Sequence, residues 1–108
     1  VGTSMAMEIF YTARQFSARE AYDMGLVNRV MPEADLDAFV DDYADRICEN
    51  APLTIATVKA SALDAGRDPA DRDVARIDAM VEACFDSDDY KEGRTAFMEK
   101  RKPQFSGR

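Results

Sequence analysis

The sequence predicts a mainly α fold, an antiparallel cluster of helices in one domain that spans residues 1–108. Apolar residues recur at the spacing of one helix face in two long segments, roughly 34–49 and 74–85. The breaks between segments are short and hold the Pro and Gly residues that begin and end helices. Only Leu26–Met31 contains valines without a helix signal, which indicates a brief extended segment that ends at Pro32.

The opening segment, residues 3–12, is predicted to be a helix that is apolar on nearly every side. Such a helix is normally buried all round. The rest of the chain is too small to cover it, and the chain opens at Val1 without an initiator Met. We therefore expect a piece of a longer protein, with residues 1–14 packed on a part that lies outside the chain. A processed N-terminus is the alternative.

A second, short helix is expected to begin after Ser17. Ser17 and Glu20 have the spacing of a capping box, in which each side chain bonds to the other residue's backbone amide. The helix should run to about Met24, because Gly25 suits the left-handed position that closes a helix.

The third helix, residues 34–49, has one apolar and one acidic face. Its acids lack the glycine and the alternating spacing of a calcium loop, so we interpret them as a solvated face. The apolar stripe is Leu36, Phe39, Val40, Tyr43 and Ile47.

Three more helices are expected. Pro52 suits the first turn of one that stops at Gly66, and Asp68-Pro69 is interpreted as the start of the next, with Val74, Ile77, Val81 and Phe85 on one stripe. Asp86 or Ser87 should cap the last, roughly 88–100, which Pro103 should end. The predicted core is Leu36, Phe39, Tyr43, Ile47, Leu63, Ile77, Val81 and Phe85.

Composition excludes several functions. Histidine is absent, which removes Ser–His and Cys–His nucleophiles and ordinary zinc sites. The net charge of −7 argues against nucleic-acid binding, and no apolar run is long enough for a membrane span. Cys48 and Cys84 are expected to be reduced, buried thiols, and the cytoplasm is the expected location. The residues alone supply no catalytic set and no metal site.

The last 22 residues differ from the rest in charge. They hold six Lys/Arg and four Asp/Glu, a net +2 against −9 in residues 1–86. On the predicted last helix, Gly93, Phe97 and Lys100 share one face with Ala96. This face suggests a phosphate-bearing ligand. The alternative is that the cations only stabilise the C-terminal end of the helix dipole. A glycine inside this helix is best tolerated if something packs close to its backbone.

Three segments of the sequence, taken in chain order, resemble those of a known protein family. They are FSAREAYDMGLVNRV before a proline, AP followed by Lys59, and DDYKEGRTAFMEKRKPQF. Together they resemble the C-terminal third of the enoyl-CoA hydratase/isomerase (crotonase) family. Ala13 departs from the pattern, because the family usually has Gly there, and a left-handed Ala13 should lose some stability.

The resemblance implies that a spiral βαβ core, absent from this chain, supplies the oxyanion hole and the catalytic acids. The chain would be the helical trimerisation domain of a homo-oligomer, either a trimer or a dimer of trimers. By motif position, Phe97 and Lys100 would be substrate-binding residues that complete a neighbouring subunit's coenzyme A site. The substrate would be an acyl-CoA thioester, with no separate cofactor, and the isolated chain would be inactive.

Two classes of function remain open. The first is an enoyl-CoA hydratase, with an isomerase or acyl-CoA lyase of the same family as alternatives. The second is a stand-alone acidic helical interaction module.

Overall fold

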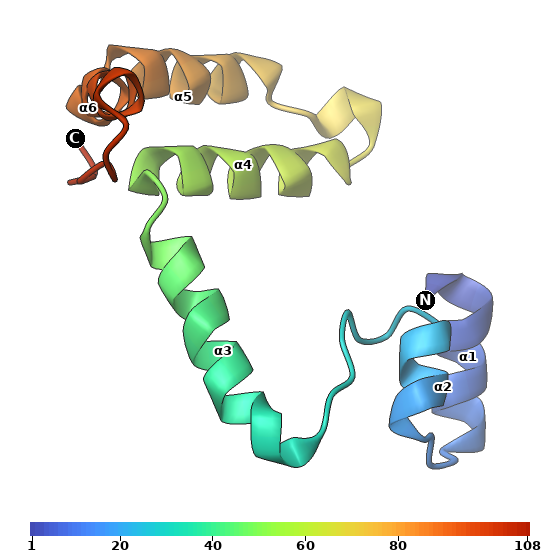
Figure 1. Ribbon diagram of the computed structural model, residues 1–108. Coiled ribbons are helices and arrows are strands. Elements are labelled where there is room, and N and C mark those ends of the chain that lie inside the picture. The colour runs from blue at the N-terminus through green and yellow to red at the C-terminus, as the bar shows by residue number, and fades with distance from the viewer. The chain divides into compact units, whose positions relative to one another are not determined.

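The computed structural model describes all residues 1–108 and confirms the mainly α fold (Figure 1). It contains no strand, and none of its helices is long and apolar enough to cross a membrane. The chain forms two compact units, Val1–Val40 and Asp41–Arg108, which are described separately. The elements are α1 (Gly2–Thr12), α2 (Ala18–Asp23), α3 (Glu33–Cys48), α4 (Pro52–Ala65), the 3₁₀ turn η1 (Pro69–Asp71), α5 (Val74–Asp86) and α6 (Asp88–Glu99).

The first unit contains the predicted capping box. Ser17 Oγ accepts from the amide of Glu20 at 3.2 Å, and the Glu20 carboxylate accepts from the amide of Ser17 at 2.9 Å. Arg14 links α1 to α2 through Glu8 at 3.6 Å and Glu20 at 3.0 Å. Gly25 follows α2 with a φ of 75°, as expected for the residue that closes this helix.

Ala13 has the left-handed geometry that the family pattern predicts for a glycine. It follows α1 with φ 48° and ψ 23°, and its amide donates to the carbonyl of Ile9 at 3.1 Å. A side chain with a Cβ is disfavoured in this region of backbone space, so α1 ends on a strained residue.

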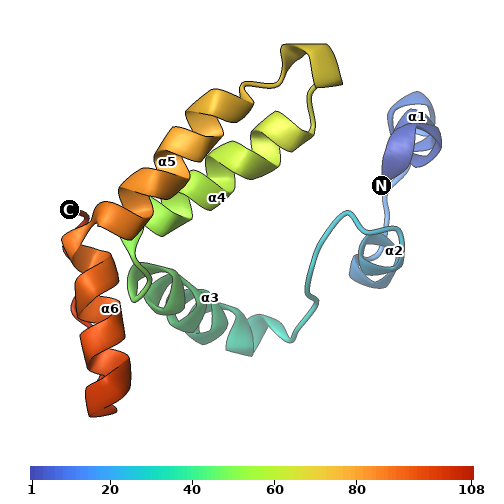
Figure 2. The ribbon, with the colours of Figure 1, turned by 90° about the horizontal axis from the view of Figure 1, so that it is seen from above.

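In the second unit α4 and α5 lie side by side and run in opposite directions (Figures 1 and 2). Buried polar groups connect them. Thr57 Oγ1 donates to the carbonyl of Leu53 at 2.8 Å and lies 3.2 Å from Cys84 Sγ on α5. At the other end of α4, the buried carboxylate of Asp64 accepts from the amide of Asp73 at 3.2 Å.

The predicted start of α5 is wrong. Asp68-Pro69 begins only the turn η1, and α5 begins at Val74 with Asp73 as its cap, which accepts from the amide of Arg76 at 3.0 Å. The helix does not continue from η1 because Arg72 is extended, with ψ 135°. Asp64 holds the amide of Asp73 at that point, a contact between residues nine positions apart.

The last helix, α6, runs across the end of the α4–α5 pair; Figure 1 shows it end-on and Figure 2 lengthwise. Ser87, and not Asp86, caps it by accepting from the amide of Tyr90 at 3.0 Å. The helix ends at Glu99, before Pro103 can act, because Lys100 is left-handed with φ 55°. The amide of Arg101 then donates to the carbonyl of Ala96 at 3.0 Å, as in a Schellman motif.

The predicted core is not buried. Ala96 is the one buried apolar residue, and of the eight predicted core residues Phe39 and Ile77 are partly exposed while the others are exposed. The apolar face of each helix is wider than the area that its neighbours cover. Within the second unit, α5 packs against α4 and α6, yet much of its apolar face stays exposed to solvent. Cys48 is likewise exposed, and Cys84 is partly buried; both are free thiols. In the first unit, Phe10 and Tyr11 of α1 stay about four-fifths exposed (81% and 80%).

Replacing Ala13 with glycine should stabilise the protein by about 1 kcal/mol, because glycine adopts the left-handed geometry without a Cβ clash. The free energy of unfolding, from chemical denaturation, is the measurement. The same substitution at the exposed helical residue Ala44 is the control and should destabilise by about 1 kcal/mol. A loss of stability at both positions would contradict the strain assigned to Ala13.

The Glu20 carboxylate accepts from the backbone and hydroxyl of Ser17 and from Arg14, which lowers its pKa from 4.5 to about 2. A lowered pKa in the folded state stabilises the protein above pH 4.5, and that stabilisation is lost as the pH falls towards 2. The Glu20→Gln variant should therefore melt below the unaltered protein at pH 6, with a gap that narrows towards pH 2. A constant gap in thermal melts across this range would refute the assignment.

Candidate ligand-binding groove

An open groove of about 920 Å³ lies among α4, α5 and α6 in the second unit. Its walls are mostly apolar, and Phe105 from the C-terminal tail contributes to it. Its lining includes Val58, Cys84, Phe85, Tyr90, Arg94 and Phe97.

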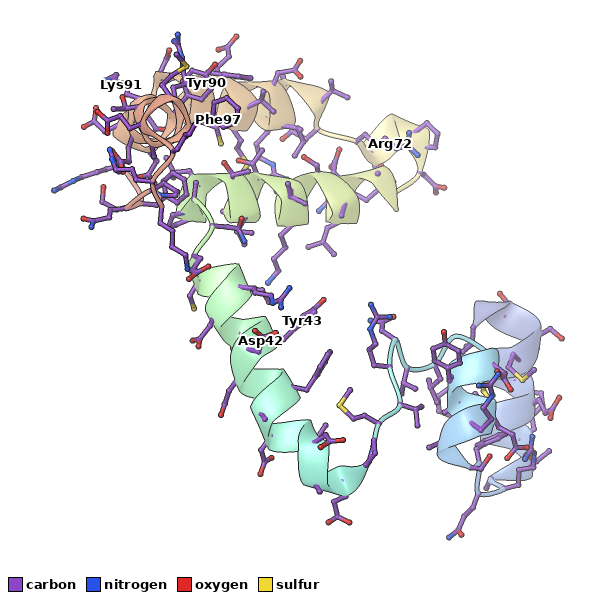
Figure 3. All side chains as sticks on the ribbon, viewed as in Figure 1. Asp42, Tyr43, Arg72, Tyr90, Lys91 and Phe97 are labelled. Carbon is purple, nitrogen blue, oxygen red and sulfur yellow. The ribbon has the colours of Figure 1, made fainter.

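The α6 wall of the groove is an aromatic face that carries one cation. Tyr90, Gly93, Arg94 and Phe97 follow one another at helical spacing, and Figure 3 shows Tyr90 and Phe97 on the side of α6 nearer α5, with Lys91 on the other side. The Tyr90 ring meets that of Phe85 edge-on, with centroids 5.1 Å apart. Phe97 has no such partner and is 82% exposed.

The tail packs against α6 at Gly93. A Cβ at this position would lie 3.5 Å from Cε1 of Phe105, an ordinary van der Waals distance, so a small side chain would also fit here. The contact does not require a glycine, but it places a tail residue in the groove wall.

Of the three consecutive cations after α6, two are neutralised. Arg101 donates to both oxygens of Glu92, at 2.6 and 2.9 Å, and Lys102 pairs with Glu49 at 2.7 Å. Arg101 and the amide of Gln104 lower the pKa of Glu92 to about 2, and Glu49 raises the pKa of Lys102. Lys100 is exposed, with no carboxylate within 4.0 Å of its ammonium.

The structure corrects the prediction that Phe97 and Lys100 share one helix face, and their binding role stays a prediction. Phe97 lines the groove, but Lys100 does not, and the two do not share a continuous helix face. The reason is the left-handed backbone at Lys100, which ends the helix before the predicted position.

Arg94 was missed by the sequence analysis. It lines the groove three residues before Phe97, and its guanidinium lies 5.8 Å from the Tyr90 ring centroid. No carboxylate pairs with it. The signal was present in the sequence, since Arg94 and Phe97 are at i and i+3 on the same helix.

The groove combines a mostly apolar surface with few charged groups. Its one carboxylate, Asp89, is 2% exposed and accepts from the amides of Ser106 and Gly107 at 2.6 and 2.8 Å. What remains is apolar surface with Arg94 in the wall, and Lys100 just beyond the helix. Such a surface suits a long ligand that is apolar along part of its length and anionic elsewhere.

The sequence profile of the enoyl-CoA hydratase/isomerase family matches residues 1–108. The chain is 37% identical over 108 residues to a methylmalonyl-CoA decarboxylase from Escherichia coli K12, covering 98% of this chain and 41% of that protein. It is 38% identical over 105 residues to a crotonyl-CoA hydratase from Syntrophomonas wolfei, covering 97% and 40%.

Solved structures give the same result. An enoyl-CoA hydratase from Mycobacterium tuberculosis H37Rv superposes with a TM-score of 0.80 at 33% identity, covering 97% of this chain and 42% of that one. An enoyl-CoA hydratase from Bacillus anthracis superposes with the same score at 29% identity, covering 100% and 42%. The chain thus spans about 40% of the length of the proteins it matches, and by the match along its whole length it belongs to the enoyl-CoA hydratase/isomerase family.

Proposed function

We propose that this chain is the C-terminal helical part of an enoyl-CoA hydratase, an enzyme that adds water across the double bond of a 2-enoyl-CoA thioester. Two observations support the activity: the family match and the 38% identity to a crotonyl-CoA hydratase. The share of its relatives that the chain spans supports its being one part of such an enzyme. The groove holds no acid that is available for proton transfer, so the catalytic acids belong to another part of the protein.

The observation that carries the binding role is the contrast among the three cations after α6. Arg101 and Lys102 are held by carboxylates, whereas Lys100 has none, and the exposed ring of Phe97 lies three residues before it. Coenzyme A combines phosphates with a less polar pantetheine arm. Lys100 would bind a phosphate as a point charge, and Phe97 would pack against the pantetheine or acyl part.

The exposed apolar faces support oligomerisation. Five large apolar side chains on α1, α4 and α5 each keep more than half of their surface exposed, and a partner could cover them: Phe10, Tyr11, Val58, Leu63 and Phe85. We propose that they pack against the βαβ core and against neighbouring subunits in a trimer or a dimer of trimers. Phe97 and Lys100 would then complete a neighbour's coenzyme A site, in a cytoplasmic enzyme.

A second activity is favoured by one comparison. The 37% identical relative is a methylmalonyl-CoA decarboxylase, so an acyl-CoA lyase reaction stays the main alternative within the family. Arg94, a cation in the groove wall with no carboxylate partner, would suit the free carboxylate on the acyl group of such a substrate. Measuring turnover of crotonyl-CoA and of methylmalonyl-CoA by the full-length protein distinguishes the two activities.

In the full-length protein, Lys100→Ala should weaken the binding of butyryl-CoA by roughly 5- to 30-fold at low salt, because one phosphate contact is lost. The loss should shrink as salt is added. Phe97→Ala should weaken binding with little salt dependence, because it removes packing. Titration calorimetry at two salt concentrations measures both effects.

Thermal melts of the same two variants are the control. If the cation only stabilises the end of the helix, Lys100→Ala will lower the melting temperature and leave the affinity unchanged. Unchanged affinity at low salt would exclude Lys100 from the coenzyme A site.

The isolated 108-residue chain should not hydrate crotonyl-CoA above the buffer rate. The reason is that its groove contains one carboxylate, which two tail amides occupy. The measurement is the loss of absorbance of the conjugated thioester. Turnover that disappears when an acid within residues 1–108 is replaced would refute the proposed division of roles.

A further inference from the structure

We propose that Arg101 is a positioning residue, which through Glu92 holds Lys100 in its left-handed conformation and so sets where the Lys100 ammonium meets a phosphate. This inference rests on the proposed coenzyme A role of Lys100. It assigns a function to Arg101 and Glu92, two residues that no part of the sequence analysis singled out.

The backbone at Lys100 needs such a restraint. Its φ of 55° is disfavoured for any residue with a Cβ, and helices most often place glycine there. Strained backbone of this kind persists only where the surroundings over-determine it. A lysine at this position therefore points to a role for its side chain, held in place by its neighbours.

The restraint begins at the next residue. The Arg101 guanidinium is bidentate to Glu92, nine positions earlier on α6, and its Nε donates to Glu99 at 2.7 Å. The Arg101 amide donates to the carbonyl of Ala96. Backbone and side chain of Arg101 together turn the chain back along α6 directly after Lys100.

The tail beyond Arg101 is anchored at further points. Glu92 also accepts from the amide of Gln104 at 2.8 Å, and the buried carboxylate of Asp89 accepts from the amides of Ser106 and Gly107. Phe105 lies against Gly93 between these two anchors. The reversal at Lys100 is therefore one end of a tail fastened along α6.

Opening the Arg101–Glu92 pair would remove the side-chain contact that holds the reversal from nine residues away on α6. Lys100 could then take right-handed geometry and extend α6 towards Pro103, which would carry its side chain around the helix axis. A lysine at position 101 retains the charge but cannot make the planar bidentate contact. The variant Arg101→Lys thus loosens the turn and keeps the net charge.

The test is a double-mutant cycle in the full-length protein, with the dissociation constant of butyryl-CoA as the readout. Arg101→Lys should weaken binding by about threefold to tenfold, and by less than about twofold once Lys100 is Ala, because the two residues act as one unit. Glu92→Gln should behave like Arg101→Lys, and it provides a second variant should the first fold poorly.

Two controls separate positioning from general destabilisation. Binding of S-butyryl-pantetheine, which has no phosphate, should be equal in the Arg101→Lys variant and the unaltered protein. In an Arg94→Ala background, the loss caused by Arg101→Lys should keep its full size, because Arg94 makes no contact with this pair.

The outcomes distinguish the two proposals. If Lys100→Ala does not weaken butyryl-CoA binding, the coenzyme A role of Lys100 fails. If Lys100→Ala weakens binding but Arg101→Lys and Glu92→Gln do not, or if the losses add fully, the positioning role of Arg101 is overturned while the proposed function stands.

Discussion

The chain has too few packing contacts to bury the apolar faces of its own helices, and the rest of the structure depends on this constraint. Every long helix carries an apolar stripe, yet Ala96 is the one apolar side chain that becomes buried. Burial of apolar surface is the main driving force of folding, so stripes left open are surfaces that stabilise the protein only when something else covers them. The exposed faces of α1, α4 and α5 and the proposed oligomer have this common cause.

Hydrogen bonds of buried polar groups help to orient the helices in the second unit. Thr57 on α4 contacts the Met80 carbonyl and the Cys84 thiol on α5. Asp64 accepts from the amide of the α5 cap residue, and Asp89 accepts from an amide of the tail and so holds the tail against α6. Each of these groups is hydrogen-bonded, as a buried polar group must be if it is not to destabilise the fold. Directional bonds of this kind specify a helix arrangement even where the apolar contact is small.

Charge pairing gives the C-terminal segment its asymmetry. In the sequence, Lys100, Arg101 and Lys102 are three equivalent cations. In the structure, Arg101 pairs with Glu92 and Glu99, and Lys102 pairs with Glu49, whereas Lys100 has no carboxylate partner. The carboxylates that pair with Arg101 also hold the turn that follows Lys100. In the proposed coenzyme A site, Lys100 would bind the phosphate and Arg101 would position Lys100.

The sequence by itself predicted the local features and the family. The local features are the helices, the Ser17–Glu20 capping box and the left-handed geometry at Ala13 and Gly25. Each depends on residues within a few positions of one another or on a motif. Only the tertiary structure decided that α5 begins at Val74, because the carboxylate that holds the amide of its cap residue Asp73 comes from Asp64 on α4. It also decided that α6 ends at Glu99, that Arg94 lies in the groove wall, and that the stripes stay exposed. Periodicity shows which face of a helix is apolar, but contacts between distant residues determine what, if anything, covers it.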